Sequence, residues 1–199
     1  KYKVINNLDK YLIEFETNFI ANGGRIIWAE DAEEALAEIL KITKSHDIKS
    51  VVKSKSMTTE EIEINGALEK NGIDVVETDL GEFIVQQSGQ KPYHIVTPAM
   101  HMSKEDVALL YNEKFNTPDN LSPEELTLYT RKLLREKFTN ADLGITGANF
   151  LISDIGAIAL TENEGNAMLS MSFPKVHIAI AGIEKIIPKL EDLDLYWPL

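Results

Sequence analysis

Two polar stretches of the sequence carry residue types that could hold a small anionic ligand. The stretch KSKSMTTEE (53–61) follows an apolar run and precedes a predicted helix, whose first N–H groups attract anions. The stretch GITGAN (144–149) contains two glycines, which tolerate positive φ and let a ligand approach the backbone closely. Both stretches also have an explanation that needs no ligand. The first could be a capped helix with a solvated basic turn, and the second could be tight turns, which need Asn and Gly. The residues alone leave both interpretations open.

The two lysines of the first stretch differ in position. Lys53 and Lys55 are two residues apart, so on extended backbone they share one side and Ser54 takes the other. Because the chain must turn before the helix, we expect Lys55, which is nearer the helix start, to be the better anion ligand.

A third polar stretch, TENEGN (161–166), places carboxylates and amides in a predicted turn at the end of a strand. We expect this stretch to lie across one cleft from the other two, because the polar stretches follow apolar strands of a parallel-type sheet. The predicted ligand-binding residues are Lys53, Ser54, Lys55, Thr59, Glu61, Thr146, Gly147, Ala148, Asn149, Asp154, Glu164, Gly165 and Asn166.

Composition limits the classes of function. The 199 residues suit one domain of ordinary size, with or without an appendage. The net charge of -12 argues against nucleic-acid binding, which needs clustered Lys and Arg. No cysteine is present, so these residues can carry neither a thiolate zinc site nor an iron–sulfur cluster. No apolar run approaches the ~20 residues of a membrane span, and we expect a cytoplasmic protein.

Several catalytic and cofactor motifs are missing from the sequence. It contains no G-x-x-x-x-G-K-[ST] phosphate loop, no G-x-G-x-x-G fingerprint and no G-x-S-x-G nucleophile motif. Its four histidines lack H-x-x-x-H spacing, so we expect no metal site based on histidine. With no flavin or nicotinamide fingerprint, the isolated chain is expected to have no redox activity of its own.

Hydrophobic periodicity and capping residues predict alternating helices and strands. Predicted strands cover 25–29, 50–53, 73–77, 94–99 and 177–182, with further strands between 143 and 160. Helices are predicted over 8–19, from Asp31, from Thr58 to Asn71, from Ser103, from Ser122-Pro123 and over 183–187. This alternation predicts an α/β fold with a mostly parallel sheet and helices on both faces. The strands after residue 143 lack intervening helices, so antiparallel pairing is expected there.

Six blocks, taken together and in this order, resemble a known family. They are VVKSKSMTTEEIEIN, GIDVVETDLGEFIVQ, HIVTPAMH, LREKFTNADLGITGANFLISDIG, TENEGN and HIAIAGIEKIIP. The set is similar to the N-terminal LUD domain of the LutB-type iron–sulfur proteins of L-lactate utilisation, from about Leu8 to Pro188. One departure is Asp154, in ISDIG, where many relatives carry Glu in an AETG block.

The resemblance implies a fold like that of NagB, ribose-5-phosphate isomerase and the CoA-transferases. It also implies that 1–24 is an N-terminal helix, 25–190 the LUD-type domain, and 191–199 the start of a further region. In LutB-type proteins that region holds four-iron–four-sulfur clusters, so this chain is expected to be a fragment without a cofactor of its own. The partners implied are the other subunits of a complex that oxidises L-lactate to pyruvate.

Two other classes of function stay open. The domain could be an isomerase or an acyl-CoA-transferase-like enzyme, with Glu61 or Glu164 as base or nucleophile. It could also be a docking module for partner subunits that retains only the shape of a cleft. The residues do not decide between these classes, because likeness of fold does not fix function.

Overall fold

A computed structural model describes residues 2–94 and 96–198. The helices are α1 (Tyr2–Ile5), α2 (Leu8–Ala21), α3 (Ala32–Ser45), α4 (Met57–Glu61), α5 (Ile64–Lys70), α6 (Leu80–Ser88), α7 (Lys104–Phe115), α8 (Pro123–Asn140), α9 (Asn166–Ser172) and α10 (Leu193–Tyr196), with short 3-10 turns at Ile183–Lys185 and Leu190–Asp192. The strands are β1 (Ser50–Lys53), β2 (Asp74–Glu77), β3 (Leu143–Thr146), β4 (Phe150–Ile152), β5 (Ala157–Ala159), β6 (Val176–Ala179) and β7 (Ile186–Ile187). No helix in these two ranges is both long and apolar enough to span a bilayer.

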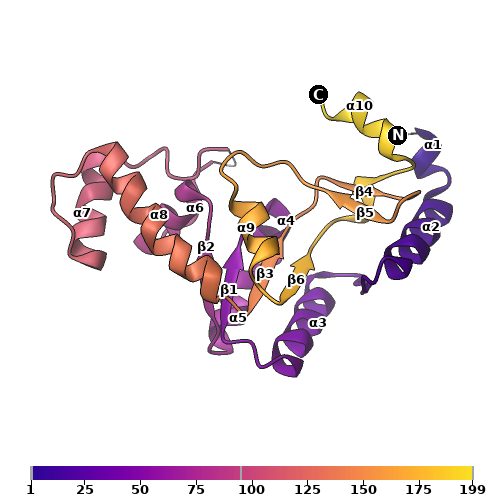
Figure 1. The fold of residues 1–199 in the computed structure, drawn as a ribbon, viewed down its shortest axis with the longest axis horizontal. Coiled ribbons are helices and arrows are strands. Elements are labelled where there is room, and N and C mark those ends of the chain that lie inside the picture. The colour runs from indigo at the N-terminus through magenta and orange to yellow at the C-terminus, as the bar shows by residue number, and fades with distance from the viewer. Residues whose placement is uncertain (1, 95, 199) are drawn as a thin grey trace.

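The larger sheet has four parallel strands in the order β2-β1-β3-β6 (Figure 1). The register pairs Lys53 of β1 with Glu77 of β2 on one side and with Ile145 of β3 on the other. All four strands therefore deliver their carboxyl ends to one edge of the sheet, where ligand sites of open α/β sheets gather.

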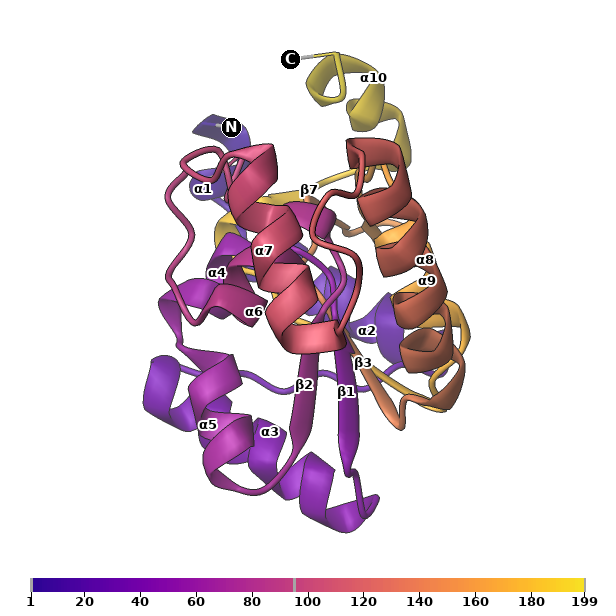
Figure 2. The ribbon, with the colours of Figure 1, turned by 90° about the vertical axis from the view of Figure 1, so that its left-hand side faces the viewer.

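Alternate residues of these strands build two separate cores, one on each face of the larger sheet. On one face, Val51, Val75 and Leu143 pack with α3 and α5 through residues such as Ile39 and Leu68. On the other, buried residues of two strands pack with α6, α7 and α8, namely Val52, Val76, Phe83, Ala108, Tyr111, Leu126, Leu134 and Phe138. Figure 2 shows α5 with α3, and α7 beside α8, around β1 and β2.

The smaller sheet, in the order β5-β4-β7, lies beside the larger one and next to both ends of the chain (Figure 1). Its β4–β5 pair is antiparallel and its β4–β7 pair is parallel. α2 covers it through Tyr11 and Phe15, and Tyr196 of α10 packs against Phe150.

A close approach between β3 and α9 requires Gly144. A Cβ built on Gly144 would lie 1.8 Å from the backbone oxygen of Ser170, so any side chain there would displace the helix. This contact fixes α9, and with it the turn that precedes α9, against the larger sheet.

The predicted fold class is confirmed, including the parallel sheet and the antiparallel pairing after residue 143. Three predicted helix starts are also confirmed by side-chain caps. Asp31 accepts a hydrogen bond from the Glu34 N–H, and Ser103 and Ser122 each form a capping box.

Two predicted strands are wrong in the described part of the chain. Residues 25–29 and the described residues of 94–99 form no strand. Trp28 and Val96 are exposed, and the Val96 N–H donates to the ring of His94 instead of to a neighbouring strand. A β-propensity without a partner strand does not make a sheet, and Pro98 has no N–H to offer to one.

Several helix predictions also need correction. Residues 183–187 form a 3-10 turn (Ile183–Lys185) followed by the strand β7, and not a helix. The helix expected from Thr58 begins after Ser56 and breaks at Glu63, whose φ of 52° separates α4 from α5. α6 has no counterpart among the predicted helices, although Asp79 caps it by accepting from the Glu82 N–H. α9 was not predicted either, and it lies between β5 and β6, where no intervening helix was expected.

Candidate functional site

A buried ion-pair cluster lies at the carboxyl edge of the larger sheet. Lys53 is fully buried, and its Nζ lies 2.9 Å from Glu77 Oε1, 2.9 Å from Glu60 Oε1 and 3.0 Å from Thr59 Oγ1. An ammonium has three N–H donors, so these contacts use its hydrogen-bonding capacity in full. The β1–β2 register brings Lys53 and Glu77 together, and the first turn of α4 supplies Thr59 and Glu60.

Two oxygens of the cluster have no hydrogen-bond donor. Glu77 Oε1 accepts from Lys53 and, at 2.6 Å, from Asn65 Nδ2, while Glu77 Oε2 is buried without a partner. Asn65 Oδ1 is also buried without a partner. Carboxylate oxygens of Glu60, Glu77 and Glu82 lie within 4.8 Å of one another. The cluster thus contains two buried acceptor oxygens for which it supplies no donor, and the ammonium of Lys53 has no N–H left to offer them.

Burial and like charge shift the ionisation of this cluster. Burial, and after it the neighbouring carboxylates of Glu77 and Glu60, together raise the pKa of Glu82 from 4.5 to about 7. Burial opposes the charge of Lys53, but the attraction of Glu77 and Glu60 outweighs it and the pKa of Lys53 is raised. Lys53 therefore stays an ammonium, while Glu82 exchanges its proton near neutral pH.

A pocket of about 530 Å³ opens beside the cluster. Its lining comes from α4, α5, α6 and the segment before α7, and comprises Met57, Thr59, Glu60, Glu63, Ile64, Asn65, Gly66, Glu82, Lys91, Pro92, Tyr93 and His94. Glu60, Asn65 and Glu82 thus belong both to the cluster and to the pocket wall.

A second polar place lies at the same sheet edge, at the start of α6. The Leu80 N–H donates to Glu164 Oε2 at 3.2 Å, so a carboxylate from the TENEGN turn already occupies this helix N-terminus. Partial burial and the nearby Asp79 raise the pKa of Glu164, while the Leu80 N–H and Lys55 counteract them. Lys55, partly exposed, donates from Nζ to the Val96 carbonyl at 3.0 Å.

The first two predicted stretches meet directly. The Ser54 N–H donates to the Ile145 carbonyl at 2.9 Å, and a Cβ on Gly147 would lie 2.7 Å from Ser56 Oγ. Lys55 and Glu164 are close enough to interact electrostatically, so the third stretch lies at the same edge of the sheet. Of the predicted ligand-binding residues, however, only Thr59 lines the 530 Å³ pocket.

The other predicted residues have structural contacts. Thr146 Oγ1 is 2.9 Å from His177 Nε2, and burial lowers the pKa of that histidine. Asn149 Oδ1 accepts from the Thr161 N–H, and Asn166 Oδ1 accepts from the Ala167 N–H. Gly165 supplies the positive φ (76°) that precedes α9; Ala148 is half-buried and Glu61 is exposed on α4.

Asp154 lies apart from the other predicted site residues. It follows β4 in the smaller sheet, and its Oδ1 accepts from the Leu190 N–H at 3.2 Å. The shorter carboxylate here holds the chain after β7 in place by orienting backbone.

Sequence reasoning missed Glu60, Asn65, Glu77 and Glu82. A signal was present for Glu77, because two parallel strands that end in Lys53 and Glu77 place opposite charges side by side when their registers match. For Glu82, the D-x-x-E spacing after β2 predicts a helix start, but the buried side chain points to the cluster rather than to the cap.

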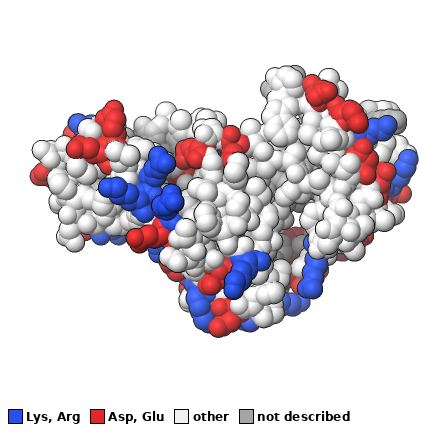
Figure 3. All heavy atoms as spheres, in the orientation of Figure 1, with Lys and Arg blue, Asp and Glu red and all other residues white. Residues whose placement is uncertain are grey.

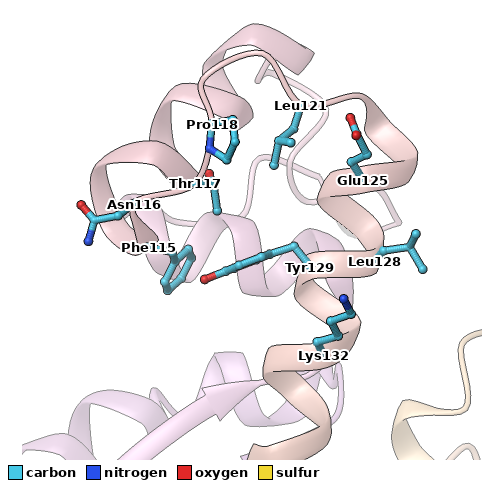
Figure 4. A pocket seen from close by; sticks show the side chains of 9 residues that line it. All are labelled: Phe115, Asn116, Thr117, Pro118, Leu121, Glu125, Leu128, Tyr129 and Lys132. Atoms are coloured by element: carbon cyan, nitrogen blue, oxygen red, sulfur yellow. The ribbon is translucent and has the colours of Figure 1, made fainter.

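A further pocket of about 400 Å³ lies between the end of α7 and α8, far along the chain from the cluster (Figure 4). Its walls are mostly apolar and include Phe115, Leu121 and Tyr129. It contains none of the predicted site residues.

Comparison with known proteins gives one consistent family. The family model described as LUD domain matches residues 12–197. Lactate utilization protein B of Bacillus pumilus (strain SAFR-032) is 46% identical over 190 residues, which are 95% of this chain and 40% of that protein. The protein of the same name from Bacillus cytotoxicus is 45% identical over 191 residues, 96% of this chain and 40% of that protein. No solved structure gives a significant match.

Proposed function

Because this chain belongs to the LUD domain family, we propose that it serves L-lactate utilisation as the LUD domain of an iron–sulfur subunit in a cytoplasmic complex that oxidises L-lactate to pyruvate. The observation that carries the proposal is the 46% identity to lactate utilization protein B over 95% of the chain. The chain spans about 40% of the length of the curated relatives it matches. In this proposal the four-iron–four-sulfur clusters are held by cysteines outside these 199 residues, which contain none.

The domain's own task in the proposal is to bind a small anion at the start of α6. The geometry supports this because a carboxylate, that of Glu164, already accepts from the Leu80 N–H there. Lys55 lies near enough to influence Glu164, and an ammonium stabilises a bound carboxylate or phosphate. An incoming anion such as L-lactate would displace Glu164 and take its place between Lys55 and the helix N-terminus.

Contact with partner subunits is supported by an exposed apolar surface on α9. Met168, Leu169 and Phe173 are 60%, 37% and 50% exposed. Figure 3 shows a wide area without charged side chains over α9 on this face of the molecule. Exposed apolar side chains grouped in this way are typical of surfaces that another protein covers.

The proposal is tested on the full-length protein that contains this chain. We expect iron in the purified protein and lactate-dependent dye reduction once its partner subunits are added. The 199-residue domain alone should reduce no dye, because it contains no cysteine that could hold an iron–sulfur cluster. A full-length protein without iron, or a complex that ignores lactate, would contradict the proposal.

An isomerase or acyl-CoA-transferase-like enzyme is the second candidate. It is favoured by Glu82, whose pKa of about 7 suits proton transfer near neutral pH, beside a pocket of about 530 Å³. This hypothesis takes Glu82 as the reacting carboxylate in place of Glu61, which is exposed on α4, and Glu164, which accepts from the Leu80 N–H. CoA transfer or sugar-phosphate isomerisation by the domain alone, without lactate or iron, would favour this candidate over the first.

A further inference from the structure

The most unusual feature of the larger sheet's edge is a surplus of buried acceptor oxygens. Glu77 is 2% exposed, and its Oε2 has no donor within reach. Asn65 Oδ1, on the side chain that donates to the same Glu77, is also buried without a partner. Buried polar groups are almost always satisfied, so two unpartnered oxygens in one cluster indicate a group that supplies donors or positive charge.

The net charge of the cluster also indicates a site for a positively charged group. Carboxylate oxygens of Glu60, Glu77 and Glu82 lie within 4.8 Å of one another, and Lys53 is the ammonium among them. With all three carboxylates ionised, two negative charges are uncompensated. Lys53 cannot serve the remaining oxygens, because its three N–H groups already bond to Glu60, Glu77 and Thr59.

A proton on Glu82 is a partial solution to this charge. The proton neutralises one carboxylate and supplies one donor, which is consistent with the raised pKa of Glu82. It still leaves one of the two unpartnered oxygens without a donor. An anion would add to the negative charge of the cluster, and Lys53 has no N–H left to bind it.

Access is available from the 530 Å³ pocket. Glu60, Asn65 and Glu82 line its wall, so an ion that keeps several water ligands can reach them. The outer part of the pocket carries Glu63 and Lys91, whose charged atoms are 3.7 Å apart, together with His94. The negative groups are concentrated at the inner end.

We propose that Glu60, Glu77 and Glu82, together with the amide oxygen of Asn65, bind a hard divalent cation such as Mg²⁺ or Mn²⁺. All four ligands are oxygens, the donor type that these ions prefer over nitrogen or sulfur. The cation takes the free Oε2 of Glu77, while Lys53 keeps Oε1. This site lies in the 530 Å³ pocket and uses different ligand residues from the anion site proposed at the start of α6.

The direct test is titration of the protein with MnCl₂ by calorimetry at pH 8, after treatment with a chelator and its removal. We expect one saturable Mn²⁺ site per chain, from which Mg²⁺ competes Mn²⁺ away. Glu82→Gln should weaken Mn²⁺ binding at least about tenfold, because even changes outside the ligand set cost metal sites that much. Glu69→Gln, an exposed carboxylate on α5 outside the pocket, is the matched control and should leave binding unchanged.

Glu60→Gln is a second test variant. The Glu60 side chain is 31% exposed, so its replacement is well tolerated sterically. It should also weaken Mn²⁺ binding at least about tenfold. Mn²⁺ should raise the Tm of the unaltered protein and of Glu69→Gln, but not that of Glu82→Gln. Absence of saturable Mn²⁺ binding at pH 8, or equal affinity in Glu82→Gln, Glu60→Gln and the unaltered protein, would overturn the proposal.

Discussion

Lys53 and Lys55 are two residues apart, yet the fold gives them opposite surroundings. Lys53 is fully buried, with Glu60, Glu77 and Thr59 on its ammonium. Lys55 is partly exposed and donates only to a backbone carbonyl in the segment before α7. The difference shows that two lysines of one motif at a strand end can have different roles. Lys53 holds the carboxylates of the edge together, while Lys55 keeps a partly exposed ammonium.

Replacing Lys53 with Met should change the stability of the protein more than any other substitution predicted here. The change leaves Glu77 and Glu60 without their counter-charge in a buried site, so we expect a loss of about 3–5 kcal/mol in the free energy of unfolding. Urea denaturation at pH 7 measures it. Lys55→Met is the matched control and should lose less than about 1 kcal/mol. Equal losses in the two variants would show that the buried cluster stabilises nothing.

The pH dependence of stability isolates the contribution of Glu82. Its pKa is raised from 4.5 to about 7 in the folded chain, so between these values the folded state binds more protons than the unfolded state. This contribution is present below pH 4.5 and is lost as the pH rises to about 7. We expect a loss of about 1–3 kcal/mol, reduced by solvent at the pocket.

Denaturation of the unaltered protein and of Glu82→Gln from pH 4 to 8, in the presence of a chelator, checks this expectation. The variant lacks the titrating group, so its stability should fall less across that range. Parallel pH profiles would mean that Glu82 ionises as it does in the unfolded chain.

Lys55→Met tests whether the partly exposed lysine binds anions. Loss of a charge-assisted hydrogen bond should lower the affinity for L-lactate, phosphate or CoA by roughly tenfold or more, about 1.4 kcal/mol. Calorimetric titration of both proteins with these three anions measures the change. Unchanged anion binding in Lys55→Met would assign Lys55 a structural role.

Removal of Glu164 should have the smallest effect on stability. Its carboxylate interacts with the N-terminus of α6 near the surface, a contribution of about 0.3–1 kcal/mol. Glu164→Ala frees the Leu80 N–H, so we expect phosphate binding to tighten while Lys55→Met weakens it. Weaker phosphate binding in Glu164→Ala would place Glu164 among the ligands and remove its role as a competitor.

Local signals were sufficient for much of the fold. Asp31, Ser103 and Ser122 cap their helices as predicted, because a capping side chain bonds to backbone only two or three residues away. The strands β1 and β2 were predicted correctly from short apolar runs rich in Val, which are typical of buried strands. Residues 25–29 were misread, since strand formation depends on a partner strand that the local sequence does not specify.

The sequence by itself determined the α/β class, the meeting of KSKS with GITG at one edge, and the family to which the chain belongs. Only the tertiary structure decided which lysine is buried. The register of β1 against β2 sets Lys53 opposite Glu77, and the break at Glu63 turns Asn65 toward the same carboxylate. Glu60, Glu77 and Glu82 come from three different elements, so no spacing along the chain encodes their convergence within 4.8 Å. The burial and mutual repulsion that raise the pKa of Glu82 arise only once those elements have packed.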